Sequence, residues 1–124
     1  MSYYTYFDLE IENPNNIEYS EEEIVQQLYE RWSSAAKAEA AANAFRYKTF
    51  KDMLFDAMQW DEYEEDMIAL SKLNPDLHFV LYGSGESSGD FWVEHFINGK
   101  YQLCFGHIVY DEFDENKMEE WEEW

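Results

Sequence analysis

Residues 91–109 read FWVEHFINGKYQLCFGHIV and hold two apolar, aromatic-rich runs on either side of Asn98 and Gly99. An Asn-Gly pair favours a type I′ turn, because both central residues of that turn need positive φ. The runs Phe91–Ile97 and Tyr101–Val109 are therefore predicted to form an antiparallel hairpin. Its expected cross-strand pairs are Trp92 with Phe105, Glu94 with Leu103, and Phe96 with Tyr101. We expect the aromatic-rich face made by these pairs to cover helices.

Two further strands are predicted outside this hairpin. Residues 3–12 alternate between apolar and polar side chains, which is typical of a half-buried strand. Residues 77–82 are rich in apolar and aromatic side chains and form the next expected strand. The glycine-rich stretch 83–89 follows, and we interpret it as a plain inter-strand loop. A phosphate loop would lead into a helix and usually a lysine, whereas this stretch leads into a strand and carries acids.

Helices are predicted between the first strand and the second. Ser20, with a glutamate three residues later, forms a capping box, and the apolar stripe after it continues into the alanine-rich stretch 35–44. Further helix starts are expected at Thr49 and at Asp61, and Asn74 with the following proline ends the last helix. The order strand, helices, three strands predicts an α+β fold, with an antiparallel sheet packed on two to three helices.

The chain is strongly acidic and also rich in aromatic residues. Its 124 residues include 28 acids and 8 bases, a net charge of -20, together with 5 Trp, 10 Tyr and 9 Phe. Disordered acidic chains lack such aromatic content, so we expect a folded domain. The shortage of bases argues against direct binding to nucleic acid. The partner that this charge favours is a basic protein surface that ordinarily holds nucleic acid.

The cysteine content and the chain ends bound the cellular context. The single cysteine, Cys104, cannot form an intramolecular disulfide, and neither end shows a signal segment or an apolar run long enough to span a membrane. We therefore expect one soluble, intracellular domain over residues 1–124, without membrane association. Residues 111–124 form its acidic C-terminal segment.

No pattern in the sequence favours catalysis, a metal or a cofactor. His78, His95 and His107 lack the helical spacing of ligand pairs, so we interpret them as structural or exposed. Cys104 faces Val93 in the predicted register, which favours a small buried hydrophobe over a nucleophile. Carboxylates are too abundant for any one pair to indicate acid–base chemistry. The sequence predicts a protein that is not an enzyme, and an enzyme with a carboxylate-rich site is the minor alternative.

Two acidic clusters are the strongest functional candidates. The first is DEYEED at residues 61–66, and the second is residues 111–123, where eight acids and one lysine are interleaved with Phe113, Met118 and Trp121. Such crowding destabilises a compact state, and solubility alone needs far less charge. The predicted partner-binding residues are Asp61, Glu62, Glu64, Glu65, Asp66, Asp111, Glu112, Asp114, Glu115, Glu119, Glu120, Trp121, Glu122 and Glu123.

The spacing of charge in the second cluster suggests imitation of nucleic acid. If residues 111–124 were helical they would span about 21 Å and carry one net charge per about 3 Å, close to the one per about 3.4 Å of a DNA strand. The bases are concentrated elsewhere, in the middle of the chain. They include Arg31, Lys37, Arg46, Lys48 and Lys51. This basic segment is expected to neutralise acids within one fold, although a head-to-tail dimer would serve equally.

Residues 70–102, LSKLNPDLHFVLYGSGESSGDFWVEHFINGKYQ, resemble part of the YubB-like family of small phage and plasmid proteins. The matching pieces are Leu70, Ser71, Lys72, Pro75, Asp76, the strand to Leu81, Gly83, Gly85, Glu86, Gly89, Asp90, Trp92, Asn98, Gly99 and Lys100. The resemblance covers about a quarter of the chain. It implies a ferredoxin-like fold, with a split βαβ-type sheet packed on helices, and a mobile-element origin. It implies no activity.

These observations predict a phage or mobile-element protein that works by binding. Its acidic clusters and exposed aromatic side chains would occupy the basic nucleic-acid groove of a bacterial defence effector, in the cytoplasm of the host cell. An anti-CRISPR or anti-restriction inhibitor is the concrete form of this hypothesis, and the partner would be a Cas effector or a restriction nuclease. The alternative is a non-catalytic accessory protein or a homodimeric structural protein whose charge serves solubility.

Overall fold

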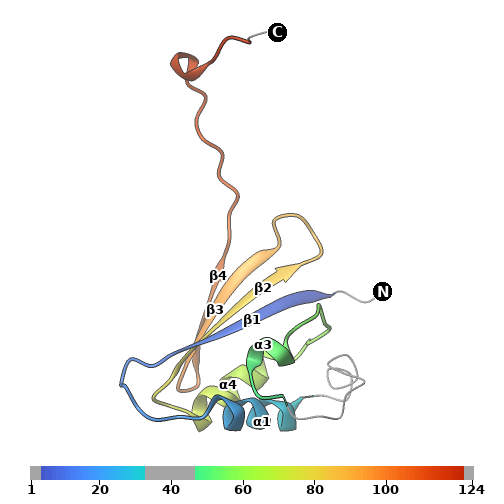
Figure 1. Ribbon diagram of the computed structural model, residues 1–124, viewed down its shortest axis with the longest axis vertical. Helices are drawn as coiled ribbons and strands as arrows, with labels where there is room; N and C mark the ends of the chain where they lie inside the picture. Colours follow the sequence, from blue (N-terminus) through green and yellow to red (C-terminus); the bar gives the residue numbers. More distant parts are fainter. Residues whose placement is uncertain (1–3, 33–46, 122–124) are drawn as a thin grey trace.

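The computed structural model describes residues 4–32 and 47–121. Its strands are β1 (Thr5–Glu12), β2 (His78–Gly85), β3 (Phe91–Ile97) and β4 (Lys100–Phe105), and its helices are α1 (Glu21–Arg31), α3 (Phe50–Met53) and α4 (Tyr63–Leu73). The strands form one antiparallel sheet, and the helices lie together on one side of it (Figure 1). The expected α+β class is confirmed. In its layers, a four-stranded antiparallel sheet with helices on one side, the arrangement is compatible with a ferredoxin-like one.

The strand order differs from what the family resemblance implies. The order is β1-β2-β3-β4, and β1 pairs directly with β2 in antiparallel register from Thr5 opposite Gly85 to Glu12 opposite His78. A split βαβ unit needs two parallel strands with a third between them, and the described strands contain no such unit. The helical segment between β1 and β2 instead returns the chain to the neighbouring antiparallel position.

The helix starts follow the predicted caps. The Ser20 hydroxyl accepts a hydrogen bond from the Glu23 amide at 3.3 Å, and the Thr49 hydroxyl accepts one from the Asp52 amide at 3.2 Å. These bonds satisfy amides that have no partner within the first helical turn. Helix α4 begins at Tyr63, two residues after the expected start. The alanine-rich stretch 35–44 lies outside the described residues.

Helix α3 is shorter than the apolar stripe after Thr49 suggests, which runs through Phe50, Met53, Leu54 and Ala57. It ends at Met53, because the chain must then turn to bring Met58 alongside β1. Met58 and Thr5 exchange two backbone hydrogen bonds, at 2.9 and 3.0 Å. The stripe still reaches the core, since Phe50, Met53 and Leu54 are all buried.

The core lies between the sheet and the helices. Phe7, Leu9, Phe79, Leu81 and Phe96 point from the strands toward the helices and are buried. They pack in one cluster with side chains from the helices, which include Val25, Leu28, Met67 and Leu70. The alternation predicted for the first strand is confirmed. Phe7 and Leu9 are buried in this cluster, and the residues next to them in the strand are exposed.

Strand β2 extends through two glycines that the sequence places in a loop. Gly83 and Gly85 belong to the strand, and the connection to β3 starts only at Glu86. The indole of Trp92 lies directly on Gly83, where an added Cβ would come within 2.1 Å of the ring. A glycine inside a strand often marks such a close approach. The Gly83 position is therefore a packing site for Trp92.

The hairpin between β3 and β4 has the predicted turn and register. Asn98 and Gly99 both have positive φ, at 44° and 81°, and the pairing places Phe96 opposite Tyr101 and Val93 opposite Cys104. The Gly99 amide also donates a hydrogen bond to the buried hydroxyl of Ser71 at 2.8 Å. The turn is thus fastened to the last part of α4.

Two expectations about this hairpin are wrong. First, the aromatic face covers helices only on β3: Tyr101 and Phe105 of the edge strand β4 remain 56% and 65% exposed. Second, β4 ends at Phe105 although the apolar run continues to Val109. The Gly106 amide still donates to the carbonyl of Phe91, the first residue of β3, and beyond that point β4 has no strand to pair with.

The turn predicts the effect of a substitution. Gly99→Val forces a β-branched residue into positive φ and is expected to lower the free energy of unfolding by about 1–3 kcal/mol. Asn98→Gly is the matched control, because glycine adopts the same φ without strain. Urea unfolding of both variants beside the parent measures the difference. Equal stability of Gly99→Val and the parent would contradict the strained-turn explanation.

Candidate functional site

The C-terminal acidic segment forms an arm that leaves the domain. Every described residue from 107 to 121, hereafter the C-terminal arm, is exposed, and the arm runs away from the sheet (Figure 1). Its only regular structure is a single 3-10 turn, Glu115–Lys117. The Asp114 carboxylate caps this turn by accepting a hydrogen bond from the Asn116 amide at 3.0 Å. Glu122 and Glu123 lie outside the described residues.

The arm is not the continuous helix on which the charge-spacing estimate depends. A helix would place like charges four residues apart, such as Asp111 beside Glu115 and Glu115 beside Glu119, and these pairs repel. Residues 111–121 hold six acids and one lysine. In an extended chain of about 3.3 Å per residue, their net charge has a spacing of about 7 Å, roughly twice the spacing along a DNA strand. The arm is therefore an extended acidic peptide, with a lower charge density than a nucleic-acid strand.

Large apolar side chains accompany the acids on this arm. Val109 is 85% exposed, Tyr110 84%, Phe113 80% and Trp121 88%, and Met118 is also exposed. Scattered single apolar residues are ordinary on protein surfaces, whereas these follow one another along one extended segment. Aromatic residues of this kind are enriched in protein interfaces. The predicted pairing of carboxylates with aromatic residues thus holds for the arm.

The cluster at residues 61–66 divides into exposed and buried acids. Asp61, Glu62 and Glu65 are exposed, and Glu64 is half-buried. Asp66, in contrast, is only 3% exposed and faces the core. Asp66 is therefore not available to a partner as a surface group, and the prediction that places it at the interface needs this correction.

Asp66 has a structural role instead. The Trp60 indole N–H donates to its Oδ2 at 2.9 Å, and the Arg31 guanidinium lies 3.7 Å from its Oδ1. Burial raises the pKa of the Asp66 carboxyl, while the Trp60 hydrogen bond and the Arg31 charge act in the opposite direction. This pair supports the expectation that a base of the middle segment neutralises an acid within the fold. Lys37 and Arg46 of that segment lie outside the described residues.

A second buried carboxylate, Glu94, lies on the helix-facing side of β3. It is fully buried, and its Oε1 accepts a hydrogen bond from the Tyr63 hydroxyl at 2.8 Å. Its other oxygen, Oε2, has no donor among the described residues. Burial, the largest effect, and the neighbouring Glu64 carboxyl raise the pKa of Glu94 to about 7, against the opposing effect of the Tyr63 bond. Tyr63 itself stacks on Trp92 with ring centroids 4.9 Å apart.

The sequence contains a signal for this residue. Glu94 stands between Trp92 and Phe96 on the face that the predicted register directs toward the helices. A lone acid among aromatic residues on an inward face is a candidate for an unusual protonation state. The side chain itself is covered completely. A titratable group in this position affects the stability of the fold.

The raised pKa of Glu94 predicts that the stability of the fold depends on pH. The folded protein holds this proton more tightly than the unfolded chain, so the free energy of unfolding should fall as pH rises from about 5 to about 8. Glu94→Gln keeps an acceptor for Tyr63 and removes the titration. At pH 8 it should be more stable than the parent by on the order of 2 kcal/mol, because each unit of pKa shift corresponds to about 1.4 kcal/mol.

The measurement is urea unfolding of the parent and the variant at several pH values. Glu86→Gln, at an exposed position in the loop after β2, is the control for loss of one negative charge. Parallel stability curves for the parent and Glu94→Gln would contradict the assignment. Asp66, whose pKa is also raised, leaves a smaller slope of the same sign in the variant.

The histidines on the sheet form a short chain of contacts. His78 Nε2 lies 2.9 Å from His95 Nδ1, and His78 Nδ1 lies 3.1 Å from a carboxylate oxygen of Glu12. Within the part of the chain that the structure describes, no group of three or more His, Cys, Asp and Glu side chains is placed to hold a metal ion. His107 is exposed at the base of the arm. Cys104 is half-buried and lies opposite Val93, as the register predicts.

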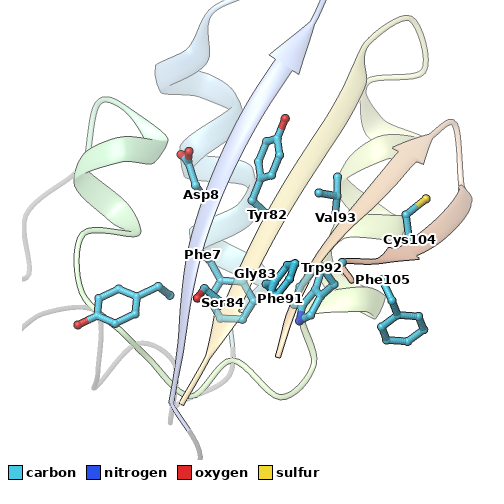
Figure 2. Close-up of a pocket in the computed structure, with 12 residues that line it drawn as sticks. Phe7, Asp8, Tyr82, Gly83, Ser84, Phe91, Trp92, Val93, Cys104 and Phe105 are labelled. Carbon is cyan, nitrogen blue, oxygen red and sulfur yellow. The ribbon is translucent and has the colours of Figure 1, made fainter. Parts of the chain in front are cut away.

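The sheet face away from the helices, hereafter the free face, carries a groove that the sequence analysis does not single out. Its volume is about 450 Å³, and it lies across all four strands near the start of the arm (Figure 2). The side chains that line it from the free face include Tyr6, Asp8, Tyr82, Ser84, Phe91 and Cys104. Strand alternation places these residues on one face, but only the strand order brings them together.

Comparisons with protein-family models, with curated proteins and with solved structures returned no match to this chain. Among the described residues, no helix is both long and apolar enough to cross a membrane. The fold and the surface thus define a small α+β domain with buried carboxylates beneath its sheet, an apolar groove on the opposite face, and an acidic, aromatic arm.

Proposed function

We propose that this protein works by binding and not by catalysis, and that its C-terminal arm occupies a basic nucleic-acid-binding surface of a partner protein. The observation that carries the proposal is the full exposure of the arm's aromatic and acidic side chains together. Carboxylates attract a basic surface over a distance, and aromatic side chains supply the apolar contact that a tight interface requires.

The concrete form of the proposal is an inhibitor of a bacterial defence effector. The partner would be a Cas effector or a restriction nuclease in the cytoplasm of a bacterial host, and the arm would compete with nucleic acid for its groove. The exposed acids of the 61–66 cluster, Asp61, Glu62 and Glu65, provide a second, smaller negative surface at the start of α4. The extended arm has a lower charge density than a nucleic-acid strand. Its apolar side chains therefore contribute more than its charge spacing to the competition with nucleic acid.

The charge balance predicts that the protein does not bind nucleic acid itself. With 28 acids against 8 bases, it should repel phosphate backbones. A mobility-shift titration at about 50 mM salt, where phosphate contacts are strongest, should show no retarded complex. A retarded complex would overturn this expectation and would direct attention to the basic segment between Arg31 and Lys51.

The partner is identified by affinity capture from a bacterial lysate followed by mass spectrometry. Recovery of a basic nucleic-acid-binding protein that releases this chain when DNA is added would support the proposal. Recovery of only the chain itself would support the dimeric structural alternative. A partner that binds DNA and this protein at once, without competition, would show that the arm does not imitate nucleic acid.

The charged and the aromatic side chains of the arm should affect different rate constants of binding. Replacing Glu119 and Glu120, together with Glu122 and Glu123, by glutamine should slow association and flatten its salt dependence. Trp121→Ala should instead raise the dissociation rate, because an apolar anchor is lost. The same change at Asp61, Glu62 and Glu65 leaves the arm intact and should slow association less, because that negative surface is smaller. Binding kinetics with the captured partner at two salt concentrations measure each effect, and unchanged affinity in all variants would refute the role of the acids.

A further inference from the structure

The groove on the free face follows from the sizes of the side chains in two cross-strand rows. One row is Asp8, Tyr82, Val93 and Cys104, and the neighbouring row is Tyr6, Ser84 and Phe91. Short side chains at Ser84 and Cys104 leave a hollow beside the aromatic rings, as Figure 2 shows for the labelled residues. The volume of about 450 Å³ is within the range of pockets that hold a ligand or a large side chain.

The helices leave this groove uncovered, and its aromatic rings contact solvent. Tyr6 is 60% exposed, Tyr82 39% and Phe91 37%. Gly106 forms the end of the groove beside Phe91, whose ring lies so close that a Cβ on Gly106 would come within 2.0 Å of it. The chain enters the arm at the next residue. The groove and the arm are therefore continuous parts of one surface.

The charge around the groove is negative. Among the described residues that line it, Asp8 carries the only charge, and Glu10 and Glu12 follow it on the same face of β1. The charge of Glu10 is the largest of the effects that raise the pKa of the Tyr82 hydroxyl, and burial, Glu12 and Asp8 act in the same direction. The arm, which begins next to Gly106 at the end of the groove, carries further acids. An apolar hollow bordered by carboxylates fits an apolar side chain with basic neighbours.

The geometry points to a two-part binding surface, in which the groove takes an aromatic or aliphatic anchor side chain from a basic segment of the partner while the arm binds the basic surface beside it. This inference rests on the proposed function for the arm but concerns a different part of the molecule. The groove would supply specificity, because it requires one apolar residue within the basic segment. The arm would supply long-range attraction, which depends only on charge.

The chain's own arm is a poor occupant of the groove. It leaves the sheet at Gly106 and runs away from the domain, with all its described residues exposed (Figure 1). The arm of a second copy is acidic, as is the border of the groove at Asp8 and Glu10, and like charges at such an interface repel. A basic partner removes this conflict.

The single cysteine makes the groove directly testable. Cys104 lines the groove, so a bound side chain should shield its thiol from N-ethylmaleimide. The probes are two short synthetic peptides of alternating lysine and arginine, one with a central phenylalanine and one with alanine in its place. At equal occupancy, the phenylalanine peptide should slow alkylation of Cys104 about fivefold, and the alanine peptide should leave the rate unchanged. Equal shielding by both peptides, or none by either, would overturn the inference.

Variants distinguish the groove from the arm. Ser84→Phe fills the hollow from an exposed position and should weaken binding of the phenylalanine peptide about tenfold, with no effect on the alanine peptide. Gln102→Phe adds the same side chain on the free face, outside the groove, and should change neither affinity. Neutralising the arm's acids should weaken both peptides equally and preserve the ratio between them. Circular dichroism confirms that each variant is folded before binding is measured.

These measurements test the two proposals separately. If the phenylalanine peptide still binds better and the arm's charges have no effect, the function proposed for the arm is refuted and the binding role of the groove is supported. If the two peptides bind equally and the arm's charges have a strong effect, the role of the groove is refuted and that of the arm is supported. Shielding of Cys104 that grows with protein concentration alone, together with a dimer in sedimentation, would show that a second copy occupies the groove and would overturn the inference of a basic partner.

Discussion

The structure depends on the burial of one face of a four-stranded sheet. Phe79, Leu81 and Phe96 on the two central strands are fully covered, and α1 and α4 supply the side chains that cover them. Burial of this kind is the dominant favourable term in folding. The described helices are all committed to this face, so the opposite face and the edge strand β4 stay open. The exposed groove and the free arm both follow from this one-sided arrangement.

The acids of this chain serve two purposes that are separated in space. Asp66 and Glu94 are buried, where hydrogen bonds from Trp60 and Tyr63 satisfy one oxygen of each. Both bonds tie α4 and the loop before it to the aromatic cluster around Phe7, which lies 5.2 Å from Trp60 by ring centroids. The exposed acids among the described residues contribute to a negative surface potential. Net charge alone therefore overstates the charge available to a partner, because part of it is held inside the fold.

Local sequence signals were accurate where short-range chemistry decides the outcome. The caps at Ser20 and Thr49, the turn at Asn98 and Gly99, and the hairpin register all depend on residues within a few positions of each other. The errors arose where a distant residue decides. Gly83 extends strand β2 and lies against Trp92, and β4 ends at Phe105 because β3 offers no residue to pair with it beyond Phe91.

The sequence by itself determined the α+β class, the hairpin and the concentration of acidic and aromatic residues in the last part of the chain. These properties follow from periodicity, turn preference and composition, which act locally. Only the tertiary structure decided which acids remain on the surface, that β1 pairs directly with β2, and that Tyr6, Tyr82, Phe91 and Cys104 border one groove. Each of these depends on strand order and on the placement of helices, because residues far apart in sequence become neighbours only when the sheet and its cover assemble.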